Sequence, residues 1–151
     1  MYEIERRFLI SPDKIPVLSY EAVRYSRYIE TFFIQTNPKI QFIKEVEGHT
    51  ENRTYYRVEN GIKSEIPEDE YYDNFPRHIH NIVKYRTYKL YDKIPTFLST
   101  YTSDNLNIME IKFNNEEEAK SFEVPNWFGE EITGVSEYED VNIATKWGEL
   151  K

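Results

Sequence analysis

The sequence lacks cysteine, long apolar stretches and an excess of positive charge, and each absence excludes a class of protein. Without cysteine, disulfide bonds, thiolate metal sites and cysteine nucleophiles are all excluded. No apolar run approaches the ~20 residues of a membrane-spanning helix, and no signal-peptide pattern precedes the first predicted strand. The net charge of −8 argues against a surface that binds nucleic acid. We therefore expect a cytoplasmic protein that interacts with neither nucleic acid nor membranes.

The composition is that of a folded domain rich in β-strands. Hydrophobic residues make up 39% of the chain and charged residues 30%, which is ordinary for a globular protein. Aromatic residues reach 16%, with 13 Tyr and 9 Phe, and these residues favour strands. No repeat, low-complexity tract or Gly/Ser-rich linker divides the 151 residues. The sequence therefore predicts a single domain over residues 1–151.

Alternation of charged and apolar residues is the main structural signal. In YEIERRFLI, from Tyr2 to Ile10, Glu3, Glu5 and Arg7 share one face of a predicted strand, because successive side chains point to opposite faces. The same alternation predicts strands over 54–58, 62–66, 82–88 and 108–113. Their charged positions are Arg57, Lys63, Glu65, Lys84, Arg86, Glu110 and Lys112.

Helices are predicted in three places. Asn114 or Asn115 followed by acids indicates a short helix to about residue 122. Ser136 and Glu139 have the spacing of a capping box and predict the start of a C-terminal helix. A further short helix is predicted after Pro67, and two strands are predicted between residues 32 and 46, around an Asn-Pro turn.

The charged strand faces allow two interpretations. Each strand could belong to an open antiparallel sheet with one face in water. Alternatively, the sheet could curl until its charged side chains line an interior. Carboxylates on one face lie roughly 6.6 Å apart and repel by about 2.5 kcal/mol at an effective dielectric constant of 20. A lined interior would therefore need metal ions or basic side chains among the acids.

Two segments of the sequence also resemble a known family. YEIERRFLI is similar to the E-x-E-x-K signature that begins CYTH domains, the triphosphate tunnel metalloenzymes. VPNWFGEEITGVSEY, residues 124–138, resembles the segment before the last helix of bacterial members. The resemblance implies an α+β fold: a closed antiparallel eight-stranded β-barrel with a few flanking helices, one of them C-terminal. It also implies a tunnel that binds inorganic tripolyphosphate, nucleotides or another triphosphate.

The resemblance also assigns roles to individual residues. Glu3, Glu5, Glu65 and Glu110 would hold Mg²⁺ or Mn²⁺, because such hard ions prefer oxygen ligands. Phosphate oxygens would be bound by Arg7, Lys44, Arg57, Lys63, Lys84, Arg86 and Lys112. Glu5 and Lys84 are the catalytic candidates.

Several positions depart from the family pattern. Arg7 stands in place of a lysine, and Pro67, Phe97, Ser99 and Lys112 stand in place of acids. The seven proposed cations exceed the four proposed acids by three charges, which leaves −11 for the rest of the chain. This surplus favours an anionic ligand, and the missing acids favour one metal ion over two.

Three functions stay open at this stage. A metal-dependent triphosphate hydrolase is favoured over a protein that binds nucleotide or polyphosphate without turnover, and ATP cyclisation is the third. His78 and His80 form an H-x-H pair without a third ligand nearby, so no zinc site is predicted. A homodimer is the default expectation for the assembly.

Overall fold

The computed structural model describes residues 4–14, 26–48, 50–91, 94–102 and 106–148. A single sheet contains eight antiparallel strands in the order β1-β8-β7-β6-β2-β3-β4-β5. The strands are β1 (Ile4–Leu9), β2 (Arg27–Thr36), β3 (Lys39–Glu47), β4 (Arg53–Glu59), β5 (Ile62–Ile66), β6 (His80–Tyr91), β7 (Ile94–Tyr101) and β8 (Asn107–Phe113). The helices are α2 (Glu68–Asn74), α3 (Glu116–Ser121) and α4 (Asp140–Gly148), and short 3-10 turns lie at Pro12–Lys14, Phe75–Arg77 and Ser136–Tyr138.

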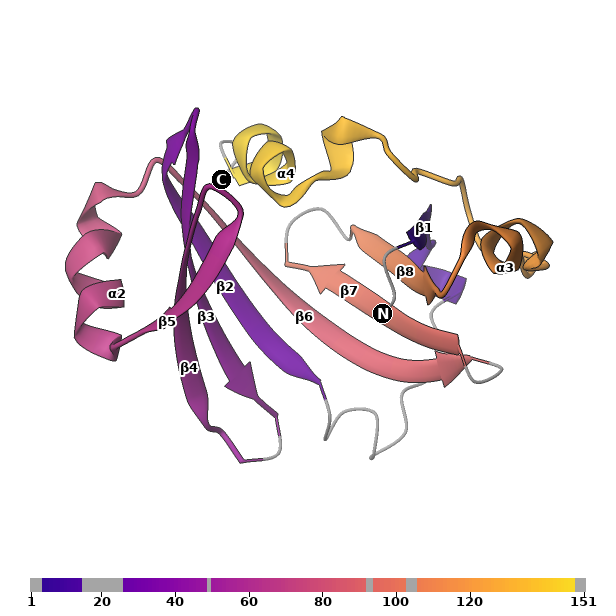
Figure 1. The fold of residues 1–151 in the computed structure, drawn as a ribbon, viewed down its shortest axis with the longest axis horizontal. Coiled ribbons are helices and arrows are strands. Elements are labelled where there is room, and N and C mark those ends of the chain that lie inside the picture. Colours follow the sequence, from indigo (N-terminus) through magenta and orange to yellow (C-terminus); the bar gives the residue numbers. More distant parts are fainter. Residues whose placement is uncertain (1–3, 15–25, 49, 92–93, 103–105, 149–151) are drawn as a thin grey trace.

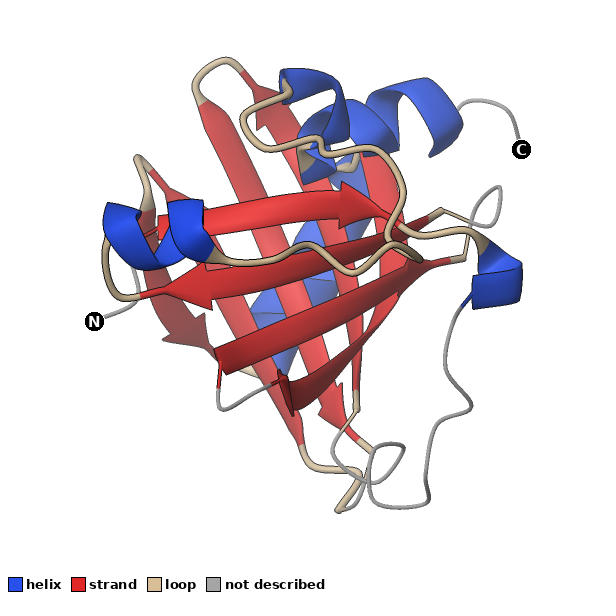
Figure 2. Ribbon diagram, turned by 90° about the vertical axis from the view of Figure 1, so that its right-hand side faces the viewer, coloured by secondary structure: helices blue, strands red, loops and turns tan. Residues whose placement is uncertain are grey.

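The sheet curls strongly, but it does not close into a barrel (Figures 1 and 2). Strands β1 and β5 form its two edges. The outer edge of β1 is already occupied by the segment 129–133, because Gly129 N donates to Leu9 O at 2.8 Å and Ile132 N donates to Arg7 O at 2.8 Å. These backbone groups would be needed to pair β1 with β5. The predicted eight antiparallel strands are confirmed, and the predicted closed barrel is wrong.

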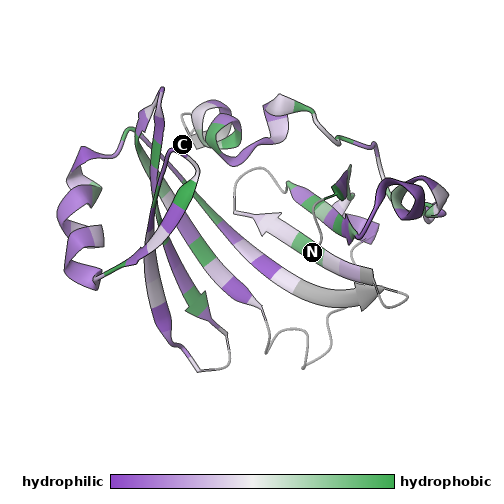
Figure 3. Cartoon of the chain, in the orientation of Figure 1, coloured by the Kyte–Doolittle hydropathy of each residue, from purple (hydrophilic) through white to green (hydrophobic). Residues whose placement is uncertain are grey.

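Strand register divides the side chains between two faces of the curled sheet. Arg7 pairs with Glu110, and Lys84 pairs with Tyr101, so these side chains lie on one face. We call it the concave face: it is the inner side of the curl, on which α4 packs (Figure 1). The opposite side is the outer face. Figure 3 shows the corresponding alternation of hydrophilic and hydrophobic residues along the strands.

Two hydrophobic clusters stabilise the outer face. The first lies under α2 and contains Phe32, Phe42, Tyr55 and Tyr71. The second packs against α3 and contains Phe8, Leu98, Met109, Ile111, Phe113 and Ala119. These helices explain how a sheet can present charged residues on its concave face and still bury a large apolar area on the other.

A third cluster lies on the concave face and holds α4 there. Ile143 and Ala144 of α4 pack against Phe33, Ile82 and Tyr101, and each of these residues is at most 5% exposed. In Figure 1 the helix lies across the open side of the curl, between the half of the sheet formed by β2–β5 and the half that contains β7 and β8. One part of the concave face is therefore covered by the C-terminal helix.

The helix predictions are largely confirmed. The Asn115 side chain caps α3 by accepting a hydrogen bond from Glu118 N at 2.8 Å, and α2 begins directly after Pro67. The capping box at Ser136 is wrong, because Ser136–Tyr138 forms a 3-10 turn and α4 begins at Asp140. No helix in the described ranges is long and apolar enough to cross a membrane, and the cytoplasmic location stays a prediction.

Candidate functional site

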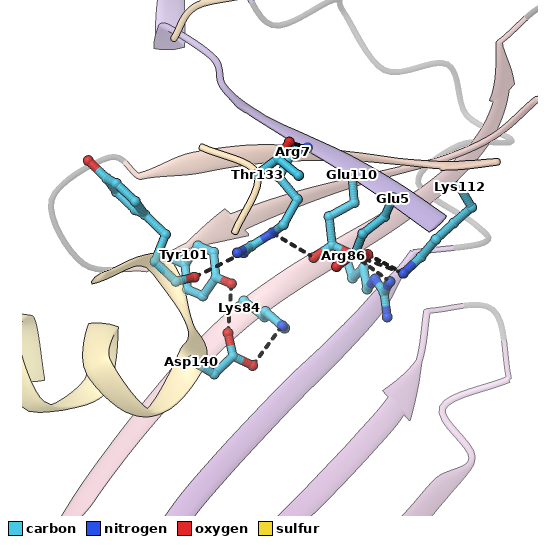
Figure 4. Close-up of polar contacts among 10 residues, drawn as sticks. Glu5, Arg7, Lys84, Arg86, Tyr101, Glu110, Lys112, Thr133 and Asp140 are labelled. Carbon is cyan, nitrogen blue, oxygen red and sulfur yellow. Dashed lines mark hydrogen bonds and ion pairs between the residues drawn. The ribbon is translucent and has the colours of Figure 1, made fainter. Parts of the chain in front are cut away.

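Strands β1, β8 and β6 bring six of the predicted site residues together on the concave face (Figure 4). Glu5 lies opposite Lys112, and Arg7 lies opposite Glu110, across the β1–β8 ladder. The remaining two members of this group, Lys84 and Arg86, come from β6. We call these six residues and Asp140 of α4 the charged cluster: Glu5, Arg7, Lys84, Arg86, Glu110, Lys112 and Asp140.

The Glu110 carboxylate lies among three cations. Arg7 Nε is 3.7 Å away, Arg86 Nη2 is 3.3 Å away and Lys112 Nζ is 3.7 Å away. Glu110 is only 13% exposed, and Arg7 is 12% exposed. Because one carboxylate cannot neutralise three neighbouring cations, this part of the charged cluster has unused positive charge even after Glu5 contacts Lys112.

Lys84 is held by α4 through a second group of contacts. Its Nζ donates to Asp140 Oδ2 at 2.9 Å, and the Tyr101 hydroxyl donates to Asp140 Oδ1 at 2.8 Å. Burial favours the neutral form of Asp140, but the charge of Lys84 and the hydrogen bonds from Lys84 and Tyr101 outweigh this and lower its pKa. Burial and the Asp140 carboxylate both raise the pKa of Tyr101, so this hydroxyl acts as a donor.

The concave face also contains two buried polar atoms that lack a hydrogen-bond partner among the described residues. They are Arg86 Nε and Ser99 Oγ. Arg86 and Ser99 lie directly opposite each other across the β6–β7 ladder, and the Arg86 guanidinium stacks 4.1 Å from the centre of the Phe97 ring. A buried donor without a partner costs about 1–3 kcal/mol. Ser99 is fully buried, whereas 30% of the Arg86 side chain is exposed, so only the Arg86 guanidinium is accessible to an anion beside the charged cluster.

Four of the other predicted residues lie away from the charged cluster. Lys63 and Glu65 belong to β5, at the far edge of the sheet, where Lys63 Nζ pairs with Glu45 Oε1 at 3.5 Å. Lys44 and Arg57 lie on the outer face: Lys44 Nζ donates to the Tyr72 hydroxyl of α2, and Arg57 pairs with Glu59. The structure does not bring these four residues to the cluster. Glu3 lies outside the described residues.

The structure adds charged residues that the sequence analysis missed. Arg27 pairs with Glu45 and Glu47 on the concave face of β2 and β3, and Asp140 pairs with Lys84. The alternation within RYIETFFIQT and KIQFIKEVE could have revealed the first three. With these acids present and with Lys44 and Arg57 on the outer face, the predicted surplus of three positive charges is wrong. Positive charge is in excess only locally, around Glu110.

The residues around Glu5 and Glu110 do not fit a divalent metal ion as they stand. Lys112 Nζ contacts Glu5 and lies 3.7 Å from Glu110, so an ammonium group already bridges the two carboxylates. A divalent ion placed about 4 Å from that ammonium would be repelled by about 8 kcal/mol at an effective dielectric constant of 20. In the described ranges, no group of three or more acidic or histidine side chains could hold a metal ion.

The curled eight-stranded sheet with its charged concave face can be compared with the folds of solved structures. Several solved structures share this fold over nearly the whole chain. Two structures of NE1496, described in one of them as an inorganic triphosphatase, match 95% of this chain with TM-scores of 0.73 and 0.71 at 20% and 22% identity, and the match covers 95% and 98% of those chains.

A third structure, of the PH1819 protein from Pyrococcus horikoshii OT3, matches 99% of this chain and 100% of its own length, with a TM-score of 0.60 at 14% identity. No protein-family model matches the sequence, and no curated protein matches it. The chain therefore shares its fold with these proteins, and its activity has to be argued from its own residues.

Proposed function

We propose that the charged cluster binds a triphosphate anion, either inorganic tripolyphosphate or the triphosphate of a nucleotide. Arg7, Arg86 and Lys112 supply positive charge around Glu110, and Lys84 lies on the same strand as Arg86. A chain of phosphates fits this arrangement because guanidinium and ammonium groups form charge-assisted hydrogen bonds with phosphate oxygens.

The observation that carries the proposal is the unused donor of Arg86. Its Nη2 reaches Glu110, whereas its buried Nε has no hydrogen-bond partner among the described residues. A phosphate oxygen accepting from Nε would remove that cost and would also approach Arg7 and Lys112. The Arg86 side chain is 30% exposed, so a ligand in the concavity can reach the guanidinium group, and the side chain has to shift for the buried Nε to donate to that ligand.

The test is calorimetric titration with tripolyphosphate of the wild type, Arg86→Gln and Arg57→Gln. Hydrogen bonds to charged groups contribute about 1.5–3 kcal/mol, so Arg86→Gln should weaken binding by about 10-fold to 150-fold. Arg57 is a matched control, because its Nε is also buried without a partner in the described part of the chain, but it lies on the outer face. Equal losses in both variants, or no binding by the wild type, would reject the proposal.

Hydrolysis of the bound triphosphate is the second candidate function. It is favoured by the likeness, over 95% of both chains, to a protein described as an inorganic triphosphatase. Glu5 and Lys84 remain the proposed catalytic residues. Phosphate release from tripolyphosphate and from ATP, with and without Mg²⁺ or Mn²⁺, tests this candidate. Release that is lost in Arg86→Gln supports it, and binding without release leaves a binding protein. Formation of cyclic AMP from ATP would indicate cyclisation instead.

A further inference from the structure

Lys112 occupies a place that a metal ion would take if Glu5 and Glu110 were metal ligands. The residue lies on β8, directly opposite Glu5 of β1, and its ammonium group forms an ion pair with that carboxylate. The same nitrogen lies 3.7 Å from Glu110 Oε2. One cation therefore bridges two carboxylates from neighbouring strands.

The surroundings of this bridge favour an ammonium group over a divalent ion. Arg7 and Arg86 also face Glu110, so an added metal ion would meet three cations. Glu65, which the resemblance made a further metal ligand, lies on β5 at the other edge of the sheet order. Magnesium is commonly held by one or two carboxylates, but here the Glu5 and Glu110 carboxylates already contact the Lys112 ammonium group.

We propose that the Lys112 ammonium group is a built-in replacement for a divalent cation at the Glu5–Glu110 pair. The protein then binds its anion without a metal ion, a part of the inference that rests on the proposed function. Lys112 bridges the two carboxylates and offsets one of their two negative charges. Arg7 and Arg86 offset the rest and, with Lys84, bind phosphate oxygens. A change of one residue should convert the place into a metal site.

The first experiment titrates metal-free protein with Mn²⁺ in the absence of any phosphate. Lys112→Glu replaces the ammonium with a third carboxylate beside Glu5 and Glu110, and it should acquire one saturable Mn²⁺ site. The wild type should show no saturable binding. Lys39→Glu is a control with the same change of charge. Lys39 is exposed at the start of β3 and forms no ion pair in the part of the chain that the structure describes.

Two outcomes of this titration would overturn the proposal. One is saturable Mn²⁺ binding by the wild type that disappears in Glu5→Gln. The other is the absence of Mn²⁺ binding by Lys112→Glu when its circular dichroism spectrum shows a folded protein. Because no phosphate is present, neither outcome depends on the proposed function.

A second experiment needs only the wild type, in case Lys112→Glu fails to fold. Tripolyphosphate is titrated into protein in buffer that contains EDTA, and then in buffer that contains Mg²⁺. Binding in EDTA supports a metal-independent site. Binding that occurs only with Mg²⁺ overturns the inference and leaves the proposed function intact. Absence of binding in both buffers rejects the proposed function, and the Mn²⁺ titration of the wild type then decides the role of Lys112.

Discussion

The ion pair between Lys84 and Asp140 connects a residue that we propose binds phosphate to the C-terminal helix. Lys84 is 12% exposed and Asp140 is 32% exposed, so solvent partly screens the pair. Because Asp140 holds the Lys84 ammonium, an entering phosphate has to compete with this carboxylate. If the proposed function holds, the aspartate lowers the affinity for anions, and its ion pair stabilises the packing of α4.

Asp140→Asn should separate these two effects. Tripolyphosphate binding should become tighter, by up to about fivefold, which corresponds to the upper range for a partly exposed ion pair. The lowered pKa of Asp140 in the folded state means that its stabilising contribution is present above pH ~4 and is lost as the pH falls through that pKa.

Urea denaturation at several pH values measures the predicted effect on the free energy of unfolding. Asp140→Asn should be less stable than the wild type at pH 7, and the difference should shrink towards pH 2. Asp73→Asn, a change at an exposed position of α2, serves as the control and should leave both the binding and the pH profile unchanged. Weaker anion binding by Asp140→Asn would contradict this account of Lys84.

At the scale of elements, the segment 129–133 determines the edge of the sheet at β1. Gly129 lies so close to β1 that a Cβ added there would be 2.5 Å from Leu9 O. Leu9 N also donates to Glu130 O at 2.9 Å, and Phe8 forms an isolated bridge with Glu131. The segment 129–133 therefore occupies this edge of β1 in place of a further strand, and the chain continues from it towards α4.

Gly129→Ala should therefore destabilise the fold by about 1–3 kcal/mol, the usual cost of forcing extra volume into a packed site. The midpoint of urea denaturation measures the change. Glu130→Ala is the neighbouring control, because its side chain is exposed and its backbone hydrogen bond is retained. A Gly129→Ala variant as stable as Glu130→Ala would show that the segment does not pack tightly against β1.

Strand alternation predicted most elements, but it could not assign every face. In β3, Ile40 and Phe42 are buried under α2 on the outer face, whereas Ile43 lies on the concave face. With apolar residues on both faces, the sequence does not show where Lys44 points. The face of Arg57 was predicted wrongly for a related reason. Tyr55 and Tyr56 are neighbours of the same type, and only the packing of α2 decides that Tyr55, which shares a face with Arg57, is the buried one.

At the scale of the whole molecule, a chain with a net charge of −8 keeps a positively charged region inside the curl of its sheet. The core of that region was predictable, because Glu5, Arg7, Lys84, Arg86, Glu110 and Lys112 follow strict alternation within their strands. The role of Asp140 was not, since it reaches Lys84 from a helix 56 residues further along the chain. The open edge of the sheet was also not predictable, because it depends on the segment 129–133, which is far from β1 in the sequence and pairs with its outer edge.

A crystal structure of the protein with tripolyphosphate tests the central claim most directly. The account predicts a phosphate chain on the concave face, with oxygens within hydrogen-bond distance of Arg86 Nε and of Arg7 or Lys84, and without a metal ion between Glu5 and Glu110. An anion bound on the outer face near Lys44 or Arg57, or an empty concave face at a tripolyphosphate concentration that saturates binding in solution, would contradict it.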